Sequence, residues 1–334
     1  MNKETDKKTL RWGILGAGDI ARKFARSARV VPQAEVQAVA SNTSGKAQAM
    51  AKEWKIPTAY DSYEALVQDP NIDLVYVANT HNFHHAAVLL ALRAGKGVLC
   101  EKPLAMNAGE AGEMIDQARQ SELFLMEAMW SRFLPVFRQS REWVAAGEIG
   151  EVRQVQASFG VPVTPEQRSR VFDPALAGGA LLDLGIYPLA LASMLAGGKA
   201  PEEMVSLVEK GPTGVDHTCS LQLRYPKALQ ASLLASVDYR ASNIAEIVGT
   251  RGKIHLPDLF MCAQEVTLIR DGERITRAFP EPPEETFRHE IEEVQRCWWA
   301  GEKESPEMPL DETLQLAKTM DAFRAQWGLR YPGE

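Results

Sequence analysis

Residues 10–21 read LRWGILGAGDIA, a short apolar strand that runs directly into the pattern G-x-G-x-x-A. Gly16 permits a tight turn, Gly18 lets a pyrophosphate approach the backbone, and Ala21 lets the following helix pack closely on the strand. The amides at the start of that helix are then available to phosphate groups. Because a second apolar strand follows at residues 36–40, the stretch predicts a βαβ dinucleotide-binding unit rather than a plain structural turn. The residues expected to contact the cofactor here are Gly16, Gly18, Asp19 and Ile20.

The end of the second strand bears on which nicotinamide cofactor is used. Residues 41–46 read SNTSGK and contain no acid. An acid at this place pairs with the ribose 2′-hydroxyl of NAD, whereas a basic residue accommodates the 2′-phosphate of NADP. Short polar groups and Lys46 leave room for a phosphate, so the sequence favours NADP, with NAD as the alternative. The residues expected around this part of the cofactor are Ser41, Asn42 and Lys46.

Polar residues also follow two later strands. An apolar run at residues 74–78 ends in Asn79-Thr80-His81-Asn82, and another at residues 98–100 ends in Glu101-Lys102-Pro103. Proline stops a strand, and open α/β sheets bind ligands at the carboxyl ends of their strands. Lys102 is therefore a candidate active-site residue, although a Lys-Pro pair that merely closes a surface turn gives the same pattern. The residues expected at the cofactor from this region are Thr80, His81, His85, Glu101 and Lys102.

Three histidines, His81, His84 and His85, gather at the start of the helix expected over residues 83–94. Such a cluster invites comparison with a metal site, but no carboxylate or cysteine accompanies it at ligand spacing. We therefore expect no metal. We expect His81 and His85 to cap the helix or line the nicotinamide pocket, and His84 to face solvent.

The order of the expected elements divides the chain in two. Strands alternate with helices up to residue 126, as in a doubly wound parallel sheet. Strand-like segments then follow one another from residue 152 to residue 279, which predicts a separate, mainly antiparallel sheet, and two helices close the chain. The predicted fold is α/β, with a Rossmann dinucleotide-binding domain over residues 10–126 and an α+β domain over residues 127–334. Residues 1–9 are polar and are expected to form a disordered tail.

Composition and charge exclude several classes of protein. The 334 residues carry a formal net charge of -7, which argues against a general affinity for nucleic acid or anionic membranes. No apolar run reaches the roughly 18 residues that span a bilayer, and the first nine residues lack the apolar segment of a secretory signal. Four cysteines lie far apart without a C-x-x-C pair, which fits reduced thiols in a cytoplasmic protein.

One segment of the second half combines polar side chains with an apolar setting. Residues 178–188 read GGALLDLGIYP, in which Asp183 and Tyr187 are four positions apart and would share one face of a helix. Polar groups in so apolar a segment are costly unless they are hydrogen-bonded or used. Pro188 predicts a kink or a fresh helix start. A capping aspartate with a core tyrosine and a catalytic pair explain this pattern equally well.

Taken together, these motifs resemble the glucose-fructose oxidoreductase / inositol dehydrogenase (Gfo/Idh/MocA) family of NAD(P)-dependent enzymes. Within the family, the resemblance is to the dimeric dihydrodiol dehydrogenase and NADP-dependent D-xylose dehydrogenase branch. The segments that carry it are residues 99–103 (LCEKP), 126–130 (MEAMW) with Arg132-Phe133, 178–187 (GGALLDLGIY) and 213–216 (TGVD). Much of the wider family has histidine in place of Tyr187. At Asn42 and Lys46 a strongly NADP-selective member would be expected to carry arginines.

The resemblance implies a hydride transfer between nicotinamide and a hydroxyl or carbonyl carbon of a sugar, a dihydrodiol or a dicarbonyl. It implies that Lys102 and Tyr187 meet at the nicotinamide, with Tyr187 as general acid/base, Lys102 as the cation that assists it and Asp183 as an orienting group. It also implies that the open sheet of the second domain stacks against another subunit, giving a homodimer. The residues matched to the substrate side are Trp130, Arg132, Phe159 and Asp183, and for Trp130 and Phe159 ordinary packing between domains is the alternative.

Other functions fit part of the sequence. A non-catalytic dinucleotide sensor would keep the glycine motif but has no need for Lys102, Asp183 and Tyr187 together. A glycosidase that uses a transient nicotinamide oxidation, known in the wider family, and a methyltransferase fit less of the chain.

Overall fold

The computed structural model describes residues 8–334, which form two compact units. The first contains the chain through residue 105 together with residues 109–130 and 282–310, and the second contains residues 106–108, 131–281 and 311–334. The tail expected over residues 1–9 lies outside the described residues apart from its last two.

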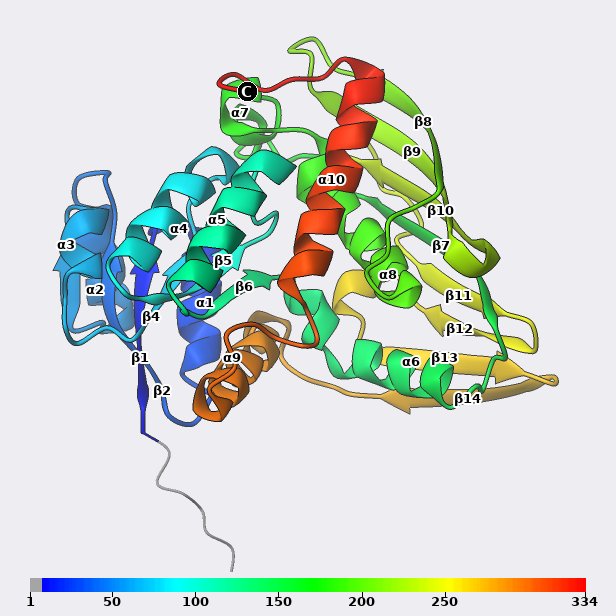
Figure 1. Cartoon of the computed structure of the whole chain (residues 1–334), viewed down its shortest axis with the longest axis horizontal. Coiled ribbons are helices and arrows are strands. Elements are labelled where there is room, and N and C mark those ends of the chain that lie inside the picture. Colours follow the sequence, from blue (N-terminus) through cyan, green and yellow to red (C-terminus); the bar gives the residue numbers. More distant parts are fainter. Residues whose placement is uncertain (1–7) are drawn as a thin grey trace, which may run out of the picture. The chain divides into compact units, whose positions relative to one another are not determined.

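The first unit is built on a six-stranded parallel sheet with the strand order β3-β2-β1-β4-β5-β6 (Figure 1). β4 and β5 are buried along their whole lengths, as expected for strands that helices cover on both faces. The strand order runs from β1 outward to β3 and then returns to β4 on the other side of β1, so the topological switch point lies between β1 and β4. Open α/β sheets bind ligands at this point. The strands are β1 (Leu10–Leu15), β2 (Ala34–Ala40), β3 (Thr58–Tyr60), β4 (Leu74–Val77), β5 (Gly97–Glu101) and β6 (Leu125–Ala128).

The helices of the first unit include one from late in the sequence. Helix α9 packs beside α1, and the Leu125 amide of β6 donates to the Lys303 carbonyl at 3.0 Å (Figure 1). Residues 282–310 thus belong to the first unit, although the sequence analysis placed everything after residue 126 in the second part. The helices are α1 (Asp19–Ala28), α2 (Lys46–Trp54), α3 (Tyr63–Val67), η1 (His81–Phe83), α4 (His84–Arg93), α5 (Ala108–Gln120), η7 (Pro283–Glu285) and α9 (Arg288–Ala300).

The second unit is built on an eight-stranded sheet with the order β14-β13-β12-β11-β7-β10-β9-β8. Only β7 and β10 pair in parallel, so the sheet is mainly antiparallel. The predicted fold class is therefore confirmed. The strands are β7 (Val152–Gly160), β8 (Glu203–Lys210), β9 (Asp216–Tyr225), β10 (Leu229–Ser236), β11 (Ala245–Gly249), β12 (Gly252–Leu256), β13 (Glu265–Arg270) and β14 (Glu273–Ala278).

A buried helix lies at the centre of the second unit. Helix α8 (Ile186–Ala196) is apolar all round and contacts β7 and β10. It follows one turn of π-helix, η4 (Leu181–Gly185), without a break, because Gly185 and Ile186 both have helical backbone angles. Pro188 falls in the first turn after this change of helix type, so of the two predictions, a kink or a fresh helix start, the structure has a local irregularity and no separate start. The other helices are η2 (Trp130–Phe133), which begins at the end of the first unit, α6 (Pro135–Ala145), α7 (Arg168–Val171), η3 (Pro174–Leu176), η5 (Pro226–Ala228), η6 (Phe260–Cys262) and α10 (Leu310–Trp327).

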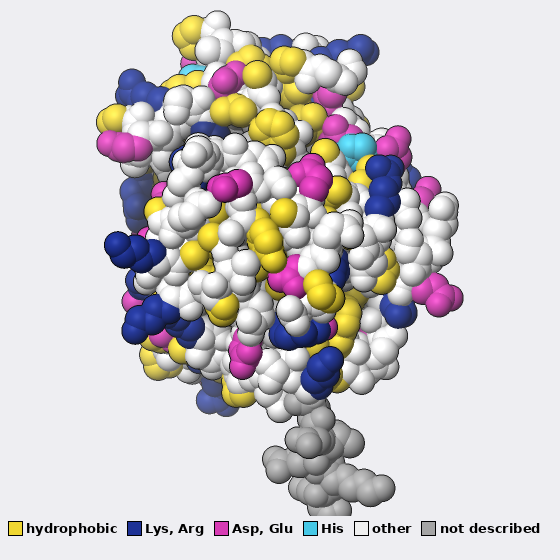
Figure 2. All heavy atoms as spheres, turned by 90° about the vertical axis from the view of Figure 1, so that its left-hand side faces the viewer, with side chains coloured by type: hydrophobic (Ala, Val, Ile, Leu, Met, Phe, Trp, Pro, Cys, Tyr) yellow, Lys and Arg dark blue, Asp and Glu magenta, His cyan; other side chains and the backbone are white. Residues whose placement is uncertain are grey.

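Burial and surface charge agree with the composition. The stretch Pro174–Ala196 is long and apolar enough to cross a membrane, but 78% of its apolar window is buried inside the fold, as in the core helix of a globular protein. On the face shown in Figure 2, acidic and basic side chains are interspersed among uncharged ones. That face offers nucleic acid no continuous basic surface.

A buried ion pair ties α10 to the segment before α6. Arg132 donates to both carboxylate oxygens of Glu312 at 2.8 and 2.7 Å, and both side chains are more than nine-tenths buried. The Ser193 hydroxyl of α8 donates to the same carboxylate at 2.8 Å. Removal of the acid alone would leave a buried guanidinium without its main counter-charge.

We predict that Glu312→Ala lowers the free energy of unfolding by about 3–5 kcal/mol, because an uncompensated charge stays buried. Chemical unfolding followed by tryptophan fluorescence measures this. Glu203→Ala is a control, because the Glu203–Arg224 pair is largely exposed and its loss should change the midpoint little. A Glu312→Ala protein with the wild-type midpoint would contradict the prediction.

Candidate functional site

The turn after β1 has the shape that a dinucleotide requires. Gly16 has φ of +110°, and a Cβ there would lie 2.6 Å from the carbonyl oxygen of Ala78, so only glycine fits. A Cβ on Gly18 would meet nothing within 4 Å, so the space in front of this residue is open. Helix α1 starts at Asp19 without a side-chain cap on its first amides. An open cradle and uncapped helix amides fit the pyrophosphate of NAD(P), and Asp19 and Ile20 lie in the first turn.

The loop after β2 combines one buried and several exposed polar groups. Ser41 is buried, and its hydroxyl accepts a hydrogen bond from the Thr43 amide at 3.1 Å, which fixes the turn. Asn42 and Lys46 are exposed at the start of α2. Neither position carries an acid, so nothing in this loop repels a ribose 2′-phosphate.

The end of β5 places Lys102 against a buried acid. Glu101 is buried and accepts hydrogen bonds from the Tyr76 hydroxyl and, at 3.2 Å, from the Lys102 amide. Burial raises the pKa of Glu101, and its hydrogen bond from Tyr76 opposes the shift. On the neighbouring strand end, the Thr80 hydroxyl donates to Asn82 at 2.7 Å. Glu101 therefore fixes the backbone from which the half-buried Lys102 side chain projects.

The histidines at the start of α4 have three different environments. His84 is fully buried, with Nδ1 2.8 Å from the Pro103 carbonyl oxygen and Nε2 3.1 Å from that of Asn79. The expectation that His84 faces solvent is wrong, because its ring fills the space between the ends of β4 and β5. His85 lies 2.9 Å from Glu113, and His81 is buried beside His84.

The second unit brings together three of the predicted site residues. The rings of Phe159 and Tyr187 meet edge to face, with centroids 5.6 Å apart. Both side chains are buried: Phe159, on β7, is 5% exposed, and Tyr187, in the first turn of α8, is 8% exposed. Asp183, in η4, accepts a hydrogen bond from the Arg170 guanidinium at 2.8 Å. Arg170 was not foreseen, because nothing in the polar sequence around it marks it as the partner of an acid thirteen positions later.

Two residues matched to the substrate side have firm partners within their own units. The Trp130 ring packs on Phe287 at 5.5 Å, and the Lys23 ammonium lies 4.5 Å from its centre. Arg132 is engaged with Glu312, as described above. A contact of either residue with substrate stays a prediction.

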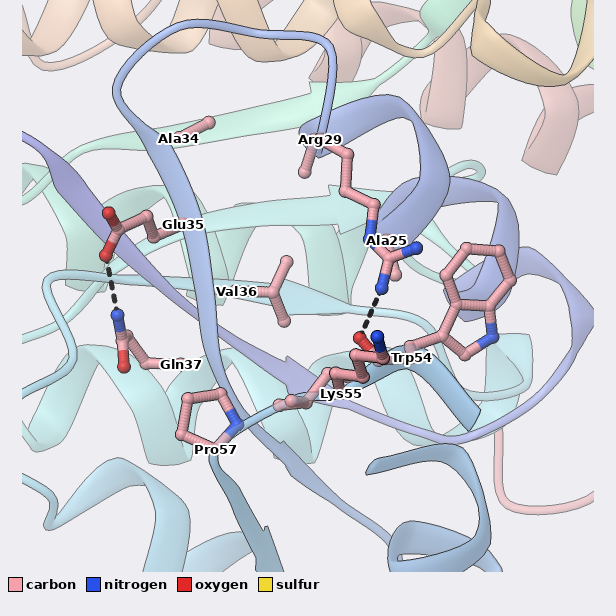
Figure 3. Close-up of a pocket in the computed structure, with 11 residues that line it drawn as sticks. Ala25, Arg29, Ala34, Glu35, Val36, Gln37, Trp54, Lys55 and Pro57 are labelled. Carbon is pink, nitrogen blue, oxygen red and sulfur yellow. Dashed lines mark hydrogen bonds between the residues drawn. The ribbon is translucent and has the colours of Figure 1, made fainter. Parts of the chain in front are cut away.

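Elsewhere in the described residues 8–334, a surface pocket lies away from the glycine motif. A pocket of about 290 Å³ is lined by the end of α1, the start of β2 and residues 54–57, with Arg29 donating to the Trp54 carbonyl (Figure 3). It lies at the amino ends of β2 and β3, away from the strand ends that carry the glycine motif. No group of three or more histidine, cysteine, aspartate or glutamate side chains in this range is placed to hold a metal ion.

Family models match both parts of the chain. Residues 10–129 match an oxidoreductase family with an NAD-binding Rossmann fold, and residues 137–255 match the GFO/IDH/MocA C-terminal domain. The trans-1,2-dihydrobenzene-1,2-diol dehydrogenase of Sus scrofa is 40% identical over 333 residues, which is 97% of this chain and 98% of that protein.

Solved structures agree over nearly the whole length. A 3-ketoreductase from Actinomadura kijaniata, KijD10, in complex with NADP and TDP-benzene matches with a TM-score of 0.83 and 27% identity, covering 95% of this chain and 98% of that one. Structures of KijD10 include a variant with tyrosine replaced by phenylalanine and one with lysine replaced by alanine. An aldose-aldose oxidoreductase from Caulobacter crescentus, complexed with glycerol, matches with a TM-score of 0.86 and 25% identity, covering 95% and 97%.

We predict that His84→Gln destabilises the protein at pH 7.5 by about 1–2 kcal/mol, because the buried hydrogen bond from the single N–H of the neutral imidazole to the carbonyl oxygen of Pro103 or Asn79 is lost. Burial lowers the pKa of His84 below its unfolded value of 6.5, so protonation favours the unfolded chain. The stability that neutral His84 contributes is therefore present above pH 6.5 and is lost as the pH falls below it.

Thermal unfolding from pH 5 to 7.5 measures both effects. The His84→Gln protein should lose less stability on acidification than the wild type. His85→Gln, which changes a partly exposed pair with Glu113, is the matched control. Parallel stability curves for the wild type and His84→Gln would rule out this role for the imidazole.

Proposed function

The chain belongs to the GFO/IDH/MocA family of oxidoreductases, and from that premise we propose that Tyr187 and Lys102 carry the proton chemistry of its reaction. It is an NAD(P)-dependent dehydrogenase or reductase that acts on CH–OH groups. The observation that carries the assignment of Tyr187 is its place: a buried tyrosine in the first turn of an apolar helix, against Phe159 and one turn beyond an ion-paired aspartate.

Nicotinamide supplies the hydride chemistry when NAD(P) is bound. The chain must then hold the cofactor, hold the substrate and move one proton. Gly16, Gly18 and the first amides of α1 would hold the pyrophosphate, and Ser41, Asn42 and Lys46 would contact the adenosine ribose. Because the ribose loop has no acid and carries a lysine, we propose a preference for NADP over NAD. Thr80, His81, His85 and Glu101, which lie at and after the ends of β4 and β5, would contact the rest of the cofactor.

Tyr187 acts at the substrate oxygen. In oxidation it accepts the hydroxyl proton, and in reduction it donates a proton to the oxygen that becomes a hydroxyl. Its packing against Phe159 limits the movement of the whole side chain, so the phenolic oxygen is presented in one direction.

Lys102 assists Tyr187 through its charge. An ammonium group near the phenol favours the phenolate and stabilises negative charge that develops on the substrate oxygen. The bond from its own amide to Glu101 fixes the backbone beneath the side chain. Asp183 orients a neighbouring substrate hydroxyl, and Arg170 holds its carboxylate in place. The KijD10 variants, in which a tyrosine is replaced by phenylalanine or a lysine by alanine, concern the same two residue types as Tyr187 and Lys102.

The substrate is a small molecule in which a hydroxyl or carbonyl carbon exchanges the hydride. Relatives are named for a dihydrodiol, a keto group and aldoses, so we propose a sugar, a trans-dihydrodiol or a dicarbonyl. Phe159 and Trp130 offer flat apolar walls that suit either an aromatic ring or the face of a sugar. Arg132, whose guanidinium is held by Glu312, would add a cation to the substrate side.

We predict turnover on a panel of aldoses, trans-dihydrodiols and dicarbonyls, followed by absorbance of the reduced nicotinamide in both directions, with NADP preferred to NAD. Tyr187→Phe and Lys102→Ala should each lower kcat by at least about 100-fold, because the proton donor or its charge partner is removed. The double variant should lose little more than either single one, because the pair acts as a unit.

Cofactor binding separates this role from a loss of folding. Both variants should bind NADP with near-normal affinity, measured by calorimetry. Phe159→Leu, which removes the ring packed on Tyr187 but keeps the proton donor, should lower kcat less than Tyr187→Phe does. Near-normal turnover in Tyr187→Phe would refute the assignment, and NADP binding without turnover by the wild type on the whole panel would favour a non-catalytic sensor.

We also propose that a second copy of the chain covers the open face of the eight-stranded sheet. Ser206 faces α10, where it is bonded to Gln326 and Trp327, so Val205 and Leu207 point to the other face. These two apolar side chains are 66% and 76% exposed, which is unusual for adjacent positions on one face. β8 is an edge strand, and a covered sheet face would remove both residues from water.

We predict that the Val205→Asp, Leu207→Asp double variant is monomeric where the wild type is dimeric, because two charges are brought into an apolar contact. Light scattering coupled to gel filtration measures the mass. Val30→Asp, at an apolar residue that is 43% exposed in the first unit, should leave the mass unchanged. A monomeric wild type would exclude the dimer.

A further inference from the structure

One buried carboxyl group of the second unit lies outside the site described so far. Asp216 begins β9 and has no exposed surface. Its Oδ2 accepts a hydrogen bond from the Leu181 amide at 2.6 Å. Leu181 is the first residue of η4, which leads through Asp183 to Tyr187. The carboxyl group therefore holds the beginning of the segment that carries two of the proposed site residues.

The other carboxyl oxygen of Asp216 has an unusual setting. Among the described residues Oδ1 has no hydrogen-bond partner. It lies against Gly179, where a Cβ would come within 2.2 Å of it, and Gly179 has φ of +120°. A side chain at this position would thus displace the carboxyl group from the start of η4. Gly179 therefore leaves the room that the Asp216 carboxyl group occupies.

The turn that Asp216 supports is also held from the opposite side. The Gly179 amide donates to the Val171 carbonyl at 2.8 Å, and the Tyr331 hydroxyl donates to the Gly178 carbonyl at 2.7 Å. The turn is fixed by these bonds before residue 180, and by Asp216 after it. Of these side-chain bonds, the one from Asp216 is made at the first residue of η4, whereas the Tyr331 bond is made before it.

The charge of Asp216 is not matched by a dedicated cation. Arg324 attracts it, but that guanidinium is bonded to Asp321 at 2.7 Å and to Glu334 at 2.8 Å. Burial raises the pKa of Asp216 to about 7, against the opposing effect of the Leu181 amide. Its protonation state therefore changes in the neutral range. The titratable or charged groups that interact with it are Cys219 on β9, Arg324 on α10 and Tyr331 at the end of the chain, and His217 is its neighbour in sequence.

We propose that Asp216 is a positioning residue for Tyr187: its carboxylate caps the helical segment that begins at Leu181, and loss of its charge loosens that cap and moves Tyr187 from its working position. A carboxylate accepts stronger hydrogen bonds from amides than a neutral carboxyl group does, and it is favoured at a helix N-terminus. The inference rests on the proposed role of Tyr187. It adds that turnover needs the ionised form of Asp216, so kcat rises with pH through the neutral range.

The first test reads the position of residue 187 without using activity. The chain has seven tyrosines, so ¹⁵N-tyrosine labelling gives few amide signals, and Tyr187→Phe identifies that of Tyr187. In the wild type this signal should shift with pH with a midpoint near 7. In Asp216→Asn, which keeps the shape of the side chain but not its charge, the shift should be absent. Asp173→Asn, which alters a cap on the Ala175 amide in the preceding loop, should leave it unchanged.

The second test uses the reaction. With NADP and trans-1,2-dihydrobenzene-1,2-diol, kcat of Asp216→Asn at pH 8 should fall about tenfold and should no longer vary around pH 7, whereas the KM for NADP should stay within twofold. Asp216→Ser, a smaller neutral cap, serves if the asparagine variant does not fold, and Asp216→Glu, where it is accommodated beside Gly179, should restore the pH dependence.

The outcomes separate this inference from the proposed function. The positioning role is overturned if the chemical shift of the Tyr187 amide does not change with pH near 7. It is also overturned if that shift changes equally in Asp216→Asn. An unchanged kcat profile in Asp216→Asn overturns it as well. If Tyr187→Phe turns over normally, the proposed function fails, and the tyrosine amide signal still decides whether Asp216 sets the position of residue 187.

Discussion

The first unit depends on one constraint, which is that neighbouring parallel strands end at the same edge of a sheet. β1, β4 and β5 are adjacent, so the residues that follow them meet although they are far apart in sequence. The contact is direct between the first two, because Gly16 lies against the Ala78 carbonyl. His84 then joins the ends of β4 and β5 by lying between two carbonyl oxygens. The position of Lys102 is a consequence of this shared edge.

Local patterns were sufficient to predict most of the fold. The glycine turn, the buried strands and the irregularity of the helix at Pro188 each follow from a few adjacent residues, and the structure has all of them. The features that were not predicted depend on residues far apart in the chain. Arg132 meets Glu312 across 180 positions, and the burial of His84 depends on two carbonyl groups that carry no sequence signal. The roles of Lys102 and Tyr187 came from the family resemblance rather than from spacing.

Two buried acids illustrate how stability and function oppose each other in this protein. Burial raises the pKa of both Glu101 and Asp216. For Asp216 the sign means that the native state is favoured by protonation, so its contribution to stability falls as the pH rises between about 4 and 7. The folded protein with ionised Asp216, which makes the stronger cap, thus has a lower free energy of unfolding than the protein with neutral Asp216. Residues retained at a loss of stability are commonly those that a reaction requires.

The placement of α9 has a consequence for synthesis of the protein. Its contacts with α1 and the bond from Leu125 to Lys303 complete the first unit, yet residues 131–281 lie between in the sequence. During translation the strands of the parallel sheet are synthesised long before α9. Part of the apolar surface of the first unit therefore stays exposed until α9 has been made. The dinucleotide-binding unit is therefore synthesised first, but it cannot complete its folding until residues 282–310 have been synthesised.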